Sequence, residues 1–214
     1  MSKTYLKQAV PAALVARDLA GVRETVTSVI ADIRARGDEA VREYSLKFDN
    51  WAPERFRLSA AQVEDIVASL PGQVIEDIRF VQAQVRGFAA AQLASMTEIE
   101  VETLPGIFLG HRHLPVASAG AYIPGGRYPL TASAHMTVLT AKAAGVGRVV
   151  ACTPPIRGQV PAATVAAAHL AGADEIHLLG GVQAVTALAL GTETIGKVDP
   201  VSYTHLTLPT ILRV

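Results

Sequence analysis

The chain has 214 residues, half of them hydrophobic, with 19 basic and 19 acidic side chains. This length is enough for one domain, or one domain with a helical appendage, to bury a core. The zero formal net charge argues against nucleic acid or an anionic membrane surface as partner. No apolar run approaches the roughly 20 residues that cross a bilayer, and the start lacks a secretory signal. A single cysteine, Cys152, excludes an intrachain disulfide and favours the cytoplasm.

The first 96 residues have the pattern of a helical region. Apolar side chains recur at helical spacing between Val22 and Ile33, and again over residues 39–48. The glycine at position 37 interrupts the pattern between the two segments. We therefore expect two helices here, joined at a sharp break.

Two further helices are expected before residue 97. Ser59, with Gln62 three residues later, is typical of a capping box, and the helix it begins should end near Pro71. The next helix should span about residues 74–95. Its apolar face is expected to comprise Ile75, Ile78, Val81, Val85 and Phe88.

The pattern changes after residue 96. Residues 97–102 alternate polar and apolar side chains, and a Pro-Gly pair separates them from residues 107–109, which predicts a β-hairpin. From there the chain is rich in Ala, Val and Gly, and strand-like segments alternate with helix-like ones. The expected strands are 119–123, 148–152 and 175–179, and the expected helices are 131–144, 161–171 and 183–190. This alternation is typical of βαβ units in a parallel sheet.

The predicted fold class is therefore α/β. It comprises an N-terminal helical region over 1–96, then a hairpin and an incomplete, Rossmann-like parallel sheet over 97–199. Residues 200–214 resemble one reading frame of a sequencing-library adapter, so we interpret them as an artefact tail and expect the natural protein to continue. The alternative is a genuine edge strand, because Thr, Val and Tyr favour strands.

Two strand–glycine–helix junctions are the candidate ligand site. The first strand of the sheet ends in Pro-Gly-Gly at 124–126, and the third ends at Gly180–Gly181, just before Gln183. Glycines at the carboxyl ends of parallel strands allow a nucleotide phosphate to approach the backbone. The glycines could equally be simple turns, since no G-x-G-x-x-G motif is present. Gln183 could hydrogen-bond an amide or a ribose, or serve only as a helix cap.

The remaining reactive side chains favour structural roles. His111 and His113 could form a metal pair on one strand face, but no Cys, Asp or third His is near them in sequence. His169 and His177 lie among apolar residues. Cys152 ends an apolar strand without an adjacent base, which favours an inert buried thiol over a nucleophile. The residues predict binding rather than a reaction.

Several blocks of the sequence resemble histidinol dehydrogenases in order and spacing. The blocks are 37–41, 47–49, 121–126, 141–146, 152–155, 180–184 and 197–199. The resemblance covers nearly all of residues 20–199. It implies an enzyme that oxidises a primary alcohol through an aldehyde to a carboxylate, using two NAD in succession and zinc, and that forms a homodimer.

The resemblance also implies site residues. Tyr122 and Gln183 match the family's NAD-contacting tyrosine and glutamine. A third NAD contact, the zinc ligands and a Glu-His catalytic pair are expected downstream of Asp199, so no catalytic or metal-binding residue is assigned to this chain. We expect the chain by itself to be inactive. The alternative function is a truncated, non-catalytic nucleotide-binding module.

The substrate is left between two alcohols. Residues 4–7 and 128–136 resemble the subgroup that acts on dihydroxypropanesulfonate, and the residues after the Pro-Gly-Gly turn depart from the usual histidinol dehydrogenase pattern. The residues therefore favour the sulfonate over L-histidinol without deciding between them. We hypothesise that Arg127 or His135 helps to place an anionic group, because arginine suits such anions. Alternatively, Arg127 is a solvated loop residue or contacts the NAD pyrophosphate.

Overall fold

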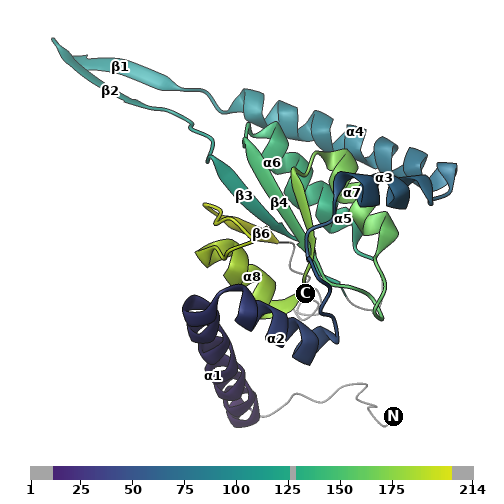
Figure 1. Cartoon of the computed structure of the whole chain (residues 1–214). Coiled ribbons are helices and arrows are strands. Elements are labelled where there is room, and N and C mark those ends of the chain that lie inside the picture. Colours follow the sequence, from purple (N-terminus) through teal and green to yellow (C-terminus); the bar gives the residue numbers. More distant parts are fainter. Residues whose placement is uncertain (1–11, 126–128, 204–214) are drawn as a thin grey trace, which may run out of the picture.

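Short apolar runs form a parallel sheet at the centre of the molecule. The computed structural model describes residues 12–125 and 129–203 (Figure 1). Within these ranges four parallel strands lie side by side in the order β5-β4-β3-β6. The strands are β3 (Ser118–Tyr122), β4 (Arg148–Thr153), β5 (Glu175–Leu178) and β6 (Val201–Tyr203).

Both faces of the sheet are buried, which explains the uninterrupted apolar sequence of its central strand. Along β4, Val149 and Ala151 belong to one hydrophobic cluster, and Val150 and Cys152 belong to the cluster on the opposite face. All four side chains are completely buried. A parallel strand covered by helices on both sides has this composition rather than a polar–apolar alternation.

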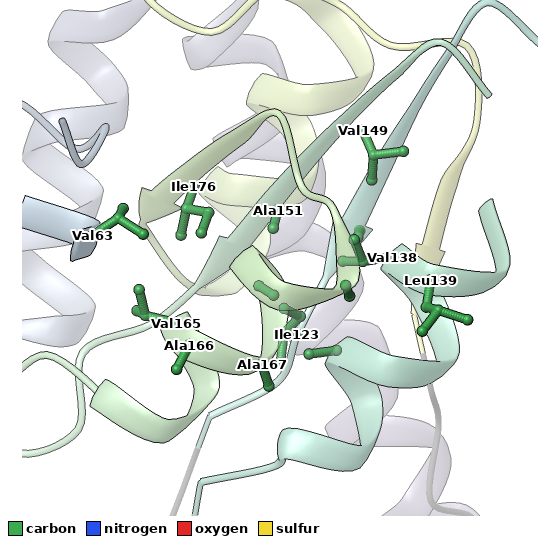
Figure 2. Close-up of a cluster of buried hydrophobic side chains, with 14 of the residues drawn as sticks. Val63, Ile123, Val138, Leu139, Val149, Ala151, Val165, Ala166, Ala167 and Ile176 are labelled. Carbon is green, nitrogen blue, oxygen red and sulfur yellow. The ribbon is translucent and has the colours of Figure 1, made fainter. Parts of the chain in front are cut away.

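One face of the sheet is covered by the helices that connect its first three strands and by two helices from the N-terminal region. These are α3 (Ala60–Ala68), α4 (Gly72–Ser95), α5 (Thr131–Ala134), η1 (His135–Leu139, a π-helix), α6 (Thr140–Ala143) and α7 (Ala162–Ala171). Figure 2 shows the core between them, where Val63, Val165 and Ile176 lie near one another. The alanine-rich face of α7, whose small side chains are buried against the sheet, allows this close packing.

The opposite face is covered by α1 (Ala12–Arg36), α2 (Asp38–Asp49) and α8 (Gly181–Leu190). Their apolar side chains form the second core with Val150 and Cys152 of β4. This core confirms the first helical pattern only in part, since Val29 and Ile33 are buried whereas Val22 is 60% exposed.

The strand order places a topological switch point beside β3. The connections from β3 to β4 and from β4 to β5 run over one face, whereas α8, which leads from β5 toward β6, lies on the other (Figure 1). The chain therefore reverses direction across the sheet between β3 and β6. In open α/β sheets of this kind, ligands bind beyond the carboxyl ends of the strands at such a point.

A hairpin projects from this body (Figure 1). Its strands, β1 (Ile99–Leu104) and β2 (Ile107–His111), pair antiparallel, and every residue of both is exposed. Gly106 adopts the left-handed backbone (φ 78°) that the tight turn between them requires. The hairpin predicted from the Pro-Gly pair is thus confirmed.

The two edges of the sheet differ. At β5, the backbone N–H of Leu178 donates to Phe56 O and that of Leu58 donates to Ile176 O, so the segment around Arg57 covers this edge. At the other edge, residues 201–203 pair with β3 as strand β6. The edge-strand interpretation of the tail therefore agrees with the structure for these three residues. The remainder of the tail, 204–214, lies outside the described residues.

The predicted α/β class, with helices, a hairpin and a parallel sheet, is confirmed. One predicted surface was wrong. Val81 and Phe88 of α4 are 40% and 68% exposed, and Gln82 is turned inward in their place. The reason is polar: Gln82 Nε2 donates to Ala167 O (2.8 Å), a bond that neither apolar side chain could make. Among the described helices, none is long and apolar enough to span a membrane.

Candidate nucleotide-binding site

Tyr122 ends β3 at the switch point, where it pairs with Cys152 of β4 and Tyr203 of β6. Its hydroxyl accepts a hydrogen bond from the backbone N–H of Gly181 (3.0 Å). Burial raises the pKa of the phenol above its usual value, and the hydrogen bond from Gly181 opposes this shift only in part. The phenol is therefore neutral at physiological pH and keeps its own O–H to donate.

The glycines at the sheet's carboxyl edge have a packing role. A Cβ added at Gly125 or at Gly180 would meet the ring of Pro154 closer than two carbon atoms can approach. The turns that follow β3, β4 and β5 therefore pack directly on one another around this proline. This packing explains both glycines without a phosphate. Gly126 lies outside the described residues.

Gly181 has a different constraint. Its φ of +65° lies in the left-handed region, and a Cβ there would be 2.7 Å from Gln183 Oε1. The glycine therefore leaves room for the glutamine amide beneath the first turn of α8. Gly181 N–H also binds Tyr122, so one turn brings the two sequence-predicted site residues, Tyr122 and Gln183, to the same place.

Gln183 is completely buried and is not a helix cap. Its Nε2 donates to Asp49 Oδ2 at 2.9 Å, across 134 positions of sequence. Its Oε1 is also buried, and no partner for it exists among the described residues. A buried polar atom without a partner costs about 1–3 kcal/mol, so native structures retain few of them. Within the described residues this acceptor is therefore unused.

Asp49 and its helix were not among the sequence-predicted site residues. Asp49 is the last residue of α2, and burial raises the pKa of its carboxyl group, while the bond from Gln183 opposes that shift. At the other end of α2, Glu193 Oε2 accepts from the N–H of Asp38 (2.8 Å), and Gly37 leaves space for that carboxylate. The matching blocks at 37–41 and 47–49 were a signal for these positions, but they did not indicate any contact.

Other candidate side chains lie elsewhere or are inert. Cys152 is completely buried and its pKa is raised to about 12, mainly by burial, which confirms the inert-thiol interpretation. His135 is buried in the π-helix beside Gln82 of α4, and its hydrogen bonding is to that residue rather than to Tyr122 or Gln183. Arg127 lies outside the described residues. His169, expected among apolar neighbours, is exposed.

His111 ends the second strand of the hairpin, and His113 follows it two residues later. The rings of His111 and His113 pack edge to face, with their centroids 5.2 Å apart. His111 Nε2 lies 3.1 Å from Thr97 O. In the part of the chain that the structure describes, no group of three or more His, Cys, Asp or Glu side chains could hold a metal ion. We therefore assign no zinc ligand to these residues.

Comparison with known proteins decides the family. The family model described as histidinol dehydrogenase matches residues 15–202, which includes Tyr122, Gln183 and Asp49. The chain belongs to the histidinol dehydrogenase family. The resemblance noted in the sequence is thus confirmed.

The curated relatives of this family carry different names. The chain is 64% identical to a histidinol dehydrogenase homolog of Shouchella clausii, over 83% of this chain and 42% of that protein. It is 44% identical to the sulfopropanediol 3-dehydrogenase of Ruegeria pomeroyi, over 89% of this chain and 43% of that protein. It is 41% identical to the histidinol dehydrogenase of Methanosarcina mazei, over 86% of this chain and 42% of that protein.

A solved structure supports the same assignment. The crystal structure of histidinol dehydrogenase from Elizabethkingia anophelis superposes with a TM-score of 0.78 at 29% sequence identity. The match covers 92% of this chain and 43% of that one. The chain thus spans about two fifths of the length of the relatives that it matches.

Proposed function

We propose that the complete protein is an NAD- and zinc-dependent dehydrogenase that oxidises a primary alcohol to a carboxylate, and that this chain supplies part of its NAD site. The observation that carries the proposal is the buried, unpartnered Oε1 of Gln183. It lies beneath Gly181, whose N–H binds Tyr122 at the switch point of the sheet. Membership of the histidinol dehydrogenase family supports the same reaction class.

The polar groups at this edge fit a dinucleotide. NAD offers carboxamide N–H and ribose O–H donors, which suit the acceptor on Gln183. The neutral hydroxyl of Tyr122 can donate to a ribose or phosphate oxygen, since its accepting side is already used by Gly181. NAD, when bound, supplies the hydride acceptor. The chain's own residues bind and orient it.

The proposal that the complete protein uses zinc rests on its membership of the histidinol dehydrogenase family. A zinc ion would supply a Lewis acid for the alcohol oxygen. The described residues hold no group of three or more His, Cys, Asp or Glu side chains that could bind it. We likewise infer from the family a cytoplasmic homodimer as the working form of the complete protein.

For the substrate we propose 2,3-dihydroxypropanesulfonate, which would give sulfolactate, ahead of L-histidinol, which would give L-histidine. The motif around His135 supports the sulfonate, and the identities of 44% and 41% to relatives of the two names do not separate them. His135 itself faces α4, so it is not a candidate for the anion contact. Initial rates of NADH formation by the complete protein, with each alcohol in turn, test this choice.

The NAD site can be tested on the chain itself. Trp51 is its only tryptophan, and its indole N–H donates to Leu178 O (3.0 Å) at the carboxyl end of β5. NADH bound at this edge should quench Trp51 emission and receive its excitation energy, in a saturable manner. Tyr122→Phe should weaken that binding. If emission changes only in proportion to added NADH, without saturation, a nucleotide site at this edge is contradicted.

The second candidate function is a non-catalytic nucleotide-binding module. Its support is that no catalytic residue has been assigned within the chain. Both candidate functions predict that the chain binds NADH. An activity assay on the complete protein distinguishes them, because only a dehydrogenase would oxidise an alcohol.

A further inference from the structure

Asp49 determines which way the buried amide of Gln183 faces. An ionised carboxylate only accepts hydrogen bonds, so the group that faces it must be the amide nitrogen. The 2.9 Å bond from Gln183 Nε2 to Asp49 Oδ2 satisfies this rule. The carbonyl oxygen of the same amide is thereby turned the other way, beneath Gly181, where no described residue binds it.

The end of α2 that carries Asp49 is held on several sides. Asn50 adopts a left-handed conformation, and its N–H bonds to the last turn of the helix. Ser45 Oγ donates to Trp51 O (2.6 Å), and the Trp51 indole in turn binds Leu178 at the end of β5. Asp49 is therefore fixed relative to the sheet, independently of its bond to Gln183.

We propose that Asp49 is a positioning residue for the NAD site: by accepting the amide N–H of Gln183, it presents Gln183 Oε1 as an acceptor for a hydrogen-bond donor of the dinucleotide. The inference rests on the proposed function, namely that NAD binds at this edge. It adds Asp49 of α2 to an NAD site whose other residues, Tyr122 and Gln183, come from β3 and α8. The burial that raises the pKa of Asp49 is consistent with its enclosed position.

Without the carboxylate, either end of the amide could face the ligand. Asparagine at position 49 has the same shape, but its side chain both donates and accepts, so it no longer enforces one orientation. A flipped Gln183 would present N–H to a ligand donor and leave both unpaired. Losing one such hydrogen bond should weaken NAD binding roughly 10- to 100-fold.

The test is a double-mutant cycle on the 214-residue chain, with Asp49→Asn, Gln183→Ala and the double variant. Isothermal titration calorimetry with NAD gives each dissociation constant. Each single variant should raise it about 10-fold or more. In the Gln183→Ala background, Asp49→Asn should have almost no further effect, because Asp49 acts through the amide. Asp77→Asn on the exposed side of α4 is the matched control and should bind as the unmodified chain does.

Thermal unfolding separates positioning from a structural role. Asp49→Asn removes a partly buried carboxylate whose pKa burial raises, so its unfolding midpoint should equal or exceed that of the unmodified chain. A lower midpoint together with weaker binding, and effects that add in the double variant, would show that Asp49 only supports the fold. Unchanged NAD affinity in Asp49→Asn, with a loss in Gln183→Ala, would overturn the inference and leave the proposed function intact.

A measurement without a change at Asp49 covers the case in which that variant does not fold. The side-chain ¹⁵N–¹H signals of Gln183 can be assigned by their absence from Gln183→Ala. Both should exchange slowly with water, and both should shift when NAD binds. Saturable NAD binding that leaves these signals unmoved would contradict the inference alone. No NAD binding by the unmodified chain would contradict both the inference and the proposed function.

Discussion

Two buried glutamines, one on each face of the sheet, differ in how fully their amides are hydrogen-bonded. Gln82 of α4 is 4% exposed, and its Nε2 binds both Ala167 O (2.8 Å) and His135 Nδ1 (3.2 Å). Gln183 of α8 is completely buried, and it binds Asp49 while its Oε1 remains without a partner. Gln82 is not among the described residues with a buried unpaired atom.

The contrast extends to the two faces. On the α4 side, Gln82 and His135 join α4, η1 and α7, and the bonds of Gln82 are to groups within this core. On the α2 side, the polar pair lies at the carboxyl edge of the sheet, next to Tyr122 and the switch point. Burial of an amide is therefore not the mark of a site. An unused bonding capacity at the edge where ligands bind is the better indicator.

The largest effect is expected from Gly181→Ala. The new methyl group would lie 2.7 Å from Gln183 Oε1 in a backbone with φ +65°, so the amide must move. NAD affinity should fall about 10- to 100-fold by calorimetry. Gly87→Ala is the control: it lies within α4 with open space around it, and it should leave binding unchanged and stabilise the chain by about 0.5–1 kcal/mol. Equal NAD affinities in Gly181→Ala and Gly87→Ala would mean that the position of the Gln183 amide does not matter for NAD binding.

Gln82→Leu tests the structural side of the comparison. The change leaves Ala167 O and His135 without their buried donor, so we expect a loss of about 1–3 kcal/mol in the free energy of unfolding, measured with denaturant. NAD affinity should not change. A large loss of affinity without a loss of stability would mean that this face also contributes to the ligand site.

A smaller effect is expected from pH. Burial lowers the pKa of His135, so the unfolded chain takes up a proton on this histidine at a higher pH than the folded chain does. Stability is then complete above the ordinary histidine pKa of about 6.5 and falls as the pH drops below it. Burial also lowers the pKa of His177, so its effect on stability has the same direction. The loss in unfolding midpoint between about pH 7.5 and pH 5.5 should be smaller in His135→Gln. An identical loss would show that His135 is not responsible.

No reaction is expected at Cys152. The thiol is completely buried and its pKa is raised to about 12, so an aromatic disulfide reagent should label it only after the chain unfolds. Rapid labelling of the native chain would mean that the core beside Tyr122 opens readily.

Much of the fold could be predicted because its signals are local. The capping box at Ser59 and Gln62 is present as expected, with both of its hydrogen bonds. The strands of the sheet were recognisable because burial on both faces requires continuous apolar runs, as in β4. The inward turn of Gln82 and the π-helix at His135 could not be predicted, because both follow from packing between α4 and α7 rather than from neighbouring residues.

The candidate site divides in the same way. Tyr122 and Gln183 could be named from their motifs, and the structure brings them to one turn through Gly181. The bond between Asp49 and Gln183 spans 134 positions and depends on how α2 packs on α8. In the sequence Asp49 could be recognised only as part of the block 47–49. No local pattern encodes such a contact.

We propose that the buried, unpartnered acceptor of Gln183 marks an NAD site. The most direct test is to titrate NAD into the 214-residue chain and into Gln183→Ala by calorimetry, with Gln82→Leu as the second buried glutamine. We expect saturable binding by the chain and by Gln82→Leu, and binding at least about 10-fold weaker by Gln183→Ala. Equal affinities in the chain and in Gln183→Ala, or no binding by the unmodified chain, would contradict the proposal.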